Sequence, residues 1–322
     1  MRRACVFCVL LPLAFAQDPK KDPDQIGTRD VSKGVNFYSV EKEMALGKAM
    51  SEQIERSGKL FTDKQINEYV DRIVQKLVRN SDAKIPITVK ILEGDDPNAV
   101  TVPGGHIYLW LGLLRTADTE AELAAALAHE IAHVAARHGT REATRSEIGQ
   151  IATIPLIFMP GWGACAGLIS ETAMPVGYFA KMRADESEAD LLGVQYLYKA
   201  GYDPVEMVDI FEKIFSFGET KHHKTLAVLA STHPASSNRI VAVQKNIAEL
   251  LKEQPQYVVN TSEFDNVKAH LAALDWIPKP PPEDDKRPSL FRKPASQVAE
   301  AKKLVPGSNP GASQLKEAYT VR

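Results

Sequence analysis

The segment from His129 to His133, with the sequence HEIAH, contains two histidines and a glutamate. Residues four apart on a helix are separated by only about 40° around its axis, so both imidazoles project from one face and can bind one ion. Imidazole nitrogen suits zinc, and a catalytic zinc has three protein ligands and a fourth position open to water. Glu130 adjoins the first histidine and can reach that water without binding the metal. The spacing therefore indicates metal-assisted hydrolysis with Glu130 as general base.

The residues around this motif help to decide between a metal site and a chance pair of histidines. The surrounding sequence, EAELAAALAHEIAHVAARH at 120–138, is rich in alanine and apolar on both sides of the motif. Such a helix is expected to be buried. Burying two histidines and a glutamate without a metal would be costly. The context therefore favours a metal site.

A third ligand must come from elsewhere in the chain. His138 lies five residues after His133, about 140° further round a continuous helix, and is better placed to cap the end of that helix. Glu186 and Asp190 are four residues apart in a second expected helix, so they share a face of it. Glu188 should point to solvent on the same helix. Glu186 and Asp190 are the better candidates.

The elements that would position these residues are mostly helices. Capping residues and helical apolar spacing predict them at 39–56, 63–78, 118–138, 182–199 and 235–252. Alternating β-branched and aromatic residues predict strands at 85–92, 99–102 and 106–110, with a tight Pro-Gly-Gly reversal before the last. The predicted fold class is α+β, mainly α-helical, with a small, mostly antiparallel β-sheet beside the metal-binding helix.

A long apolar stretch at 148–176 has the composition of a membrane span. Pro155, Pro160 and Pro175, with several glycines, would break a single helix repeatedly. We interpret the stretch as two short helical pieces or a loop that covers the domain. A membrane-contacting element is the alternative.

The composition limits the remaining classes of function. A net charge of −2 and the lack of a long basic stripe argue against nucleic-acid binding. Cys5 and Cys8 fall in the predicted signal described below. Only Cys165 remains, so no disulfide is expected.

Four motifs resemble the family of zinc endopeptidases that includes HtpX, the periplasmic protease BepA and the CAAX prenyl proteases, number 48 among the metallopeptidases. They are NAVTVPGGHIYLWLGLL at 98–114, EAELAAALAHEIAHVAARH at 120–138, ESEADLLG at 186–193 and THPASSNR at 232–239. The similarity is closest to the soluble, exported BepA-like branch, because the multiple membrane helices of HtpX-like proteins are missing.

The resemblance implies a gluzincin-like zincin domain with one zinc ion per subunit. The implied zinc ligands are His129, His133 and Glu186. Asp190 would orient a ligand histidine or act as a proton donor, and orientation is the more physical role. His233 would bind the zinc as a fourth ligand and hold the enzyme shut, or would simply precede a helix. Arg239 would contact the substrate carbonyl or its developing oxyanion.

The chain is expected to divide into four regions. Residues 1–16 have a charged start, a short apolar core and small residues around a cleavage site near Ala16, which is typical of a secretory signal. A permanent anchor is the minority alternative, because the apolar run is shorter than the ~20 residues of a spanning helix. Residues 17–36 would be a flexible leader, 37–275 the zinc metalloprotease domain, and 276–322 a Pro-rich, disordered tail.

The predicted function is a zinc metalloendopeptidase, exported to the periplasm or secreted, that cleaves unfolded or misassembled exported proteins. A peripheral membrane or envelope-assembly partner is also expected. The edge of the strand at 106–110 would pair with an extended substrate. The main alternative is a zinc-containing chaperone or binding protein whose site is closed by His233, and a purely structural metal site is another. Neither alternative explains Glu130.

Overall fold

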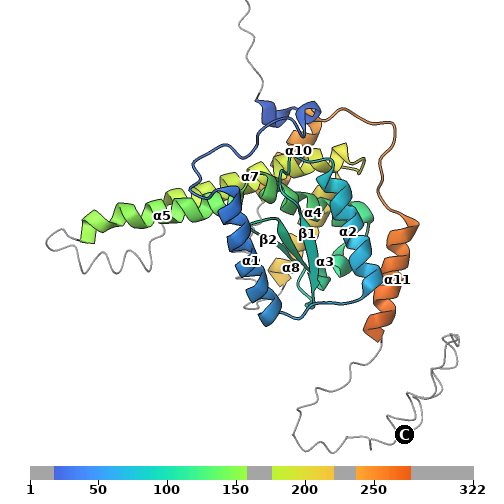
Figure 1. Cartoon of the computed structure of the whole chain (residues 1–322). Helices are drawn as coiled ribbons and strands as arrows, with labels where there is room; N and C mark the ends of the chain where they lie inside the picture. Colours follow the sequence, from blue (N-terminus) through green and yellow to red (C-terminus); the bar gives the residue numbers. More distant parts are fainter. Residues whose placement is uncertain (1–17, 158–175, 221–236, 277–322) are drawn as a thin grey trace, which may run out of the picture. The chain divides into compact units, whose positions relative to one another are not determined.

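The computed structural model of this chain describes residues 18–157, 176–220 and 237–276 (Figure 1). The chain divides into two units, Met1–Leu274 and Asp275–Arg322, and the fold below is that of the first. The predicted signal at 1–16 lies outside the described residues, as do the centre of the apolar stretch and nearly all of the predicted tail. The same is true of Cys5, Cys8, Cys165 and His233.

The described part of the first unit is mainly helical, with one small sheet, which confirms the predicted α+β class. The helices are α1 Val40–Ser57, α2 Lys64–Val78, α3 Leu111–Thr116, α4 Glu120–Ala135, α5 His138–Ile157, α7 Val176–Lys199, α8 Glu206–Thr220, α10 Ser237–Leu250 and α11 Ser262–Trp276. The strands are β1 Thr88–Leu92, β2 Ala99–Val102 and β3 His106–Trp110. Two short 3-10 helices, Pro19–Lys21 and Pro23–Gln25, precede them.

The starts of three helices follow directly from the sequence. Ser39, Asp63 and Thr119 each accept a backbone N–H of the first turn, at the beginning of α1, α2 and α4. These bonds satisfy donors that would otherwise have no partner within the helix. The predicted starts of these helices are therefore confirmed.

The sheet has the strand order β1-β3-β2, with β3 in the centre. β2 pairs with β3 antiparallel through the Pro-Gly-Gly turn, whereas β1 pairs with β3 in parallel. The sheet is therefore mixed, where a mostly antiparallel one was predicted. The chain reverses between β1 and β2 and again in the hairpin, so β3 returns in the direction of β1. Since both edges of β3 are occupied, the prediction that this strand pairs with substrate is wrong. The edge strands are β1 and β2, and β2 is the edge strand that lies beside α4.

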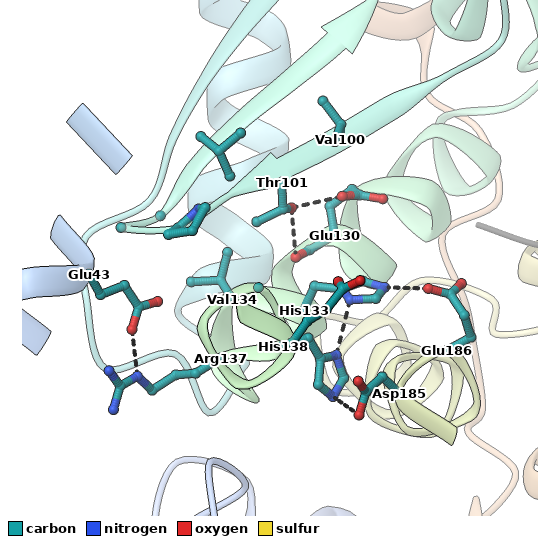
Figure 2. Close-up of a pocket in the computed structure, with 16 residues that line it drawn as sticks. Glu43, Val100, Thr101, Glu130, His133, Val134, Arg137, His138, Asp185 and Glu186 are labelled. Carbon is teal, nitrogen blue, oxygen red and sulfur yellow. Dashed lines mark hydrogen bonds and ion pairs between the residues drawn. The ribbon is translucent and has the colours of Figure 1, made fainter. Parts of the chain in front are cut away.

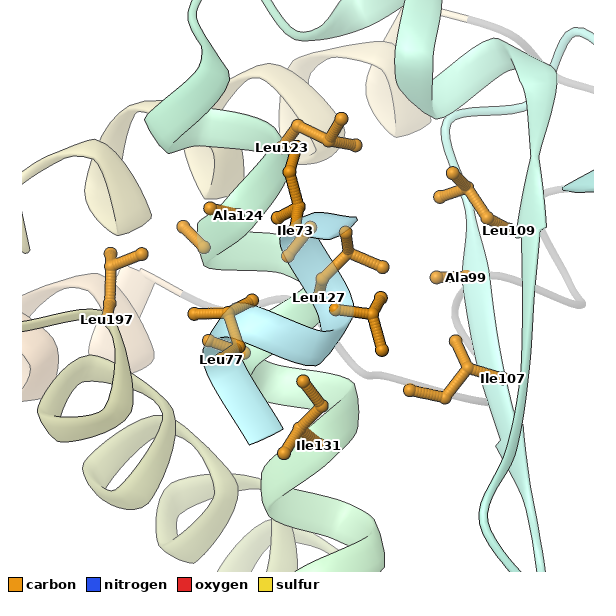
Figure 3. Close-up of a cluster of buried hydrophobic side chains, with 14 of the residues drawn as sticks. Ile73, Leu77, Ala99, Ile107, Leu109, Leu123, Ala124, Leu127, Ile131 and Leu197 are labelled. Atoms are coloured by element: carbon orange, nitrogen blue, oxygen red, sulfur yellow. The ribbon is translucent and has the colours of Figure 1, made fainter. Parts of the chain in front are cut away.

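Helix α4 runs through the middle of the hydrophobic core. Leu123, Leu127 and Ile131 recur at helical spacing along one face of α4, and all three are fully buried. In Figure 3 these side chains extend from α4 into the space shared with α2 and the sheet. The alanines on the other faces of α4 are also buried, because α7 and α8 pack against them. The metal motif is thus carried by a helix that is enclosed on nearly all sides.

Helix α4 ends earlier than predicted, at Ala135 rather than near His138. Arg137 adopts a left-handed backbone conformation, with φ of 56°, and α5 begins at the next residue. Gly139, a residue type that often ends helices, lies instead inside α5. The side chain of Arg137 stabilises the break by donating from Nε to Glu43 Oε2 at 2.6 Å and from Nη2 to the Tyr38 carbonyl at 2.8 Å.

The segment before α1 packs against the domain through Arg29. Its Nε donates to Asp82 Oδ2 at 2.8 Å, and its Nη1 donates to Gln195 Oε1 of α7 at 2.8 Å. The side chains of Arg29 and Asp82 are only 1% and 0% exposed. This packing differs from the flexible leader predicted for residues 17–36, because buried polar partners hold a segment whose composition alone suggests disorder.

Among the helices of the described residues, none combines the length and the apolar character that crossing a membrane requires.

Candidate metal centre

Three side chains from two helices converge on one point. His129 and His133 project from α4, and their Nε2 atoms are 3.1 Å apart. Glu186 reaches them from α7, with Oε2 at 3.5 Å from His129 Nε2 and Oε1 at 3.4 Å from His133 Nε2. Figure 2 shows the carboxylate of Glu186 aimed at the ring of His133.

These distances suit a tetrahedral metal ion. Zinc lies about 2.0–2.1 Å from nitrogen and oxygen ligands, so neighbouring ligand atoms of a tetrahedral site are roughly 3.3 Å apart. The three separations of 3.1, 3.5 and 3.4 Å scatter around that value. Two imidazoles and one carboxylate are also a donor set that zinc accepts readily. The residues present therefore fit a zinc ion.

Glu130 is held beside this cluster by the edge strand. Thr101 of β2 donates its hydroxyl to Glu130 Oε2 at 2.7 Å, and the same oxygen lies 3.1 Å from the Glu130 carbonyl (Figure 2). The hydroxyl has a single proton, and the shorter contact to the carboxylate is the stronger one. Thr101 thus fixes the direction of the carboxylate of Glu130, a residue that is only 3% exposed.

Asp190 and Arg239 lie behind the cluster. Asp190 Oδ1 is 3.0 Å from His129 Nδ1, so this carboxylate can hold the ring with Nε2 directed at the metal position. Arg239 of α10 donates from Nε and Nη2 to the two oxygens of Asp190, each at 2.8 Å, and its Nη1 is 3.0 Å from Glu186 Oε2. The guanidinium therefore links two carboxylates of α7. The substrate contact predicted for Arg239 stays a prediction.

The electrostatics of the cluster favour bound positive charge. Burial alone would lower the pKa of His129, but hydrogen bonds and charges from Asp190 and Glu186 raise it to about 9. Burial would raise the pKa of Asp190, but the hydrogen bonds and charge of Arg239, and then of His129, keep it below its ordinary value. A cation bound between the histidines must therefore displace a proton.

Gly193 explains how α7 comes close enough to α4 to deliver Glu186. A Cβ atom at this position would lie 3.1 Å from the backbone nitrogen of His129 and 3.2 Å from its Cα. Both are backbone atoms of a buried helix, which cannot move aside cheaply. The glycine in the ESEADLLG motif is thus a packing requirement of the site, which sequence analysis did not identify.

We expect Gly193→Ala to lower the free energy of unfolding by about 1–3 kcal/mol, because the added methyl group overpacks the contact between α4 and α7. Chemical denaturation measures this change. Gly139→Ala is the matched control, because the nearest atom to its new Cβ would be a Pro103 side-chain carbon at 3.4 Å. An unchanged stability of Gly193→Ala would contradict the close approach of the two helices.

Two further residues lie near the site, although the sequence predicted other positions for them. His138 was expected to cap α4, but its Nδ1 lies 3.0 Å from His133 Nδ1. Glu188 was expected to face solvent, but its Oε2 lies 3.1 Å from His138 Nε2. Both predictions are wrong, because the break at Arg137 redirects the chain after α4. A left-handed arginine has no signal in the sequence that would have revealed this.

A cavity of about 220 Å³ opens in front of the cluster. It is bounded by the edge strand, the Pro-Gly-Gly turn and the C-terminal part of α4, and Glu130, His133 and Glu186 contribute to its wall (Figure 2). The cavity therefore lies between β2 and the candidate metal ligands. The predicted gating residue His233 lies outside the described residues.

A helix with two histidines, a carboxylate from a second helix and a small sheet beside them are typical of zinc metallopeptidases. The chain belongs to Peptidase family M48, whose model matches residues 64–247. This finding confirms the resemblance drawn from the motifs.

Curated relatives agree with this family. The chain is 28% identical to the beta-barrel assembly-enhancing protease of Escherichia coli (strain K12) over 272 residues, which are 81% of this chain and 53% of that protein. It is 28% identical to the putative beta-barrel assembly-enhancing protease of Vibrio cholerae over 85% of this chain and 58% of that protein. The mitochondrial metalloendopeptidase OMA1 of Schizosaccharomyces pombe is 28% identical over 56% of this chain and 53% of its own length. The chain thus spans about half the length of these relatives.

Proposed function

We propose that this protein is a zinc-dependent endopeptidase in which His129, His133 and Glu186 hold one zinc ion and Glu130 is the general base. The observation that carries the proposal is that one ligand atom from each of the three residues lies within 4.8 Å of the others. Membership of a metallopeptidase family supports it.

Each residue has a defined task in this mechanism. Bound zinc would polarise the scissile carbonyl and increase the acidity of the attacking water. Glu130 accepts a proton from that water and then delivers it to the nitrogen of the leaving amine, so one carboxylate serves both steps. Thr101 keeps the Glu130 carboxylate directed into the cavity. Asp190 keeps the His129 ring oriented, with Arg239 neutralising the charge of Asp190.

The edge strand supports a preference for extended polypeptide. β2 is at the edge of the sheet, and Val100, Thr101 and Val102 line the cavity. Substrate backbone can add to such an edge through main-chain hydrogen bonds, which select for unpaired segments more than for particular side chains. Unfolded or misassembled exported proteins are therefore the proposed substrates. The relatives named for β-barrel assembly and the predicted signal at 1–16 support an exported, periplasmic setting.

Cleavage of an unfolded protein tests the proposal. The protein is incubated with unfolded casein in three conditions: without additive, with a chelator, and with a chelator followed by added zinc. We expect cleavage of casein that the chelator stops and that added zinc restores. If wild type is inert but His233→Ala cleaves, the site is a gated protease. If neither protein cleaves and wild type still prevents casein aggregation, the alternative of a zinc-containing chaperone replaces the proposal.

We expect Glu186→Ala to lower the zinc content from one ion per chain to well below one, because two imidazoles alone leave the site with too few ligands. Metal analysis after dialysis measures this content. Glu249→Ala is the control. Glu249 is a glutamate of α10 that lies far from the metal ligands in sequence, and its side chain is 60% exposed. Unchanged zinc content in Glu186→Ala would reassign the third ligand.

A further inference from the structure

Beyond the metal ligands, a line of hydrogen-bonding groups leads away from His133. Its Nδ1 lies 3.0 Å from His138 Nδ1, and His138 Nε2 lies 3.1 Å from Glu188 Oε2. His138 is only 4% exposed, so water does not compete freely for its ring nitrogens. Figure 2 shows the ring of His138 between His133 and α7.

The proposed metal site determines where the protons of this line lie, so the inference rests on the proposed function. If His133 binds zinc through Nε2, its Nδ1 carries a proton and must donate it. The facing Nδ1 of His138 is then the acceptor, because two N–H groups cannot face each other at 3.0 Å. His138 therefore carries its own proton on Nε2 and donates it to Glu188.

The charges around Glu188 keep it an acceptor. Lys20 pairs with its Oε1, and Arg141 Nη1 lies 3.2 Å from its Oε2. Asp185 is 3.9 Å from His138 Nε2 and is paired with Arg145, so Glu188 is the closer partner.

The same cations argue against a second metal ion at this place. His138, Asp185 and Glu188 have donor atoms near enough to one another for a metal to bind. However, Lys20, Arg141 and Arg145 already balance the two carboxylates. A divalent cation would add to three positive charges. With these charges already balanced, His138 is suited to hydrogen bonding with His133 and not to binding a metal ion.

The backbone brings His138 into this position at a cost. On a continuous helix its side chain would point about 140° away from His133. The left-handed conformation of Arg137 breaks the helix and turns His138 back towards α4. Non-glycine residues rarely adopt this conformation, and those that do are often found at functional sites.

We propose that His138 is a positioning residue that holds His133 in the tautomer and ring orientation needed to bind zinc through Nε2. Glu188 fixes the tautomer of His138 in turn. The ring of His129 is held in the same way, but directly by the carboxylate of Asp190. Each ligand histidine is therefore connected to a carboxylate that is paired with a cationic side chain. The two ligands differ in that the imidazole of His138 stands between His133 and its carboxylate.

Two nearly isosteric substitutions test this role. In His138→Asn the side-chain oxygen takes the place of Nδ1 and can still accept from His133, whereas His138→Leu cannot accept. By competition with a chromogenic chelator, we expect the zinc Kd of His138→Leu to rise about 10- to 100-fold and that of His138→Asn to stay within about threefold. Equal Kd values for His138→Leu and wild type would overturn the proposal, as would equal losses in both variants.

A measurement on the wild-type protein does not depend on how the variants fold. In the zinc-loaded protein with ¹⁵N-labelled histidine, we expect the ring protons on His133 Nδ1 and His138 Nε2, and a coupling across the hydrogen bond between the two Nδ1 atoms. A proton on His138 Nδ1 would overturn the proposal. If wild type binds no zinc, the proposed function itself fails, whereas a zinc-binding wild type matched by His138→Leu removes only the role of His138.

Discussion

Glu130→Gln should lower kcat/KM for peptide cleavage by about 10²- to 10⁴-fold, the usual contribution of a general base. This corresponds to about 3–5 kcal/mol of transition-state stabilisation. Glutamine has the size of glutamate and can still accept a hydrogen bond from Thr101, which lies 2.7 Å from the carboxylate. It cannot take a proton from water. The substitution therefore removes the chemistry with little change in shape.

The loss should appear in kcat rather than in metal binding, because Glu130 is not one of the three proposed ligands. Steady-state cleavage of a fluorogenic peptide, together with zinc content on the same preparation, separates the two effects. Full zinc occupancy with lost cleavage is the expected combination. Cleavage at the wild-type rate would refute the general-base role. Loss of both zinc and cleavage would instead place Glu130 among the ligands.

The parts of the site that could be predicted from sequence depend on local geometry. The histidine spacing fixes the shared face of α4, and Thr119 with Glu122 fixes where that helix begins. The Pro-Gly-Gly turn requires two glycines with positive φ, and Gly104 and Gly105 have φ of 80° and 84°. Such features depend on a few neighbouring residues, so the sequence contains enough information to place them.

The parts that could not be predicted depend on contacts between distant segments. The edge position of β2 follows from how three strands combine, and no single strand determines it. The contact between His138 and His133 depends on the backbone of Arg137, which Glu43 of α1 stabilises from 94 positions away. Polar composition suggested disorder before α1, but composition does not reveal that Arg29 has a buried partner.

Arg29→Ala should lower the free energy of unfolding by about 3–5 kcal/mol, because it leaves the carboxylate of Asp82 buried without its cation. Asp82 also accepts from the Tyr196 hydroxyl at 2.9 Å and from the Gly27 backbone N–H at 2.7 Å, so it cannot turn out to solvent. A domain is commonly stable by only 5–15 kcal/mol, so this loss is a large part of the total. Urea denaturation of the zinc-loaded protein measures it.

A double variant separates the cost of a buried, unpaired carboxylate from the cost of losing the packing of the segment before α1. Replacing both residues with apolar ones, as in Arg29→Met with Asp82→Leu, removes the unpaired carboxylate and should recover much of the stability. If the double variant is as unstable as Arg29→Ala, the hydrogen bonds from Arg29 to Gln195 of α7 and to the backbone carbonyls of residues 19, 20 and 22 are the more important contribution. A change below about 1 kcal/mol in Arg29→Ala would mean that the pair is hydrated in solution, since exposed ion pairs contribute no more than that.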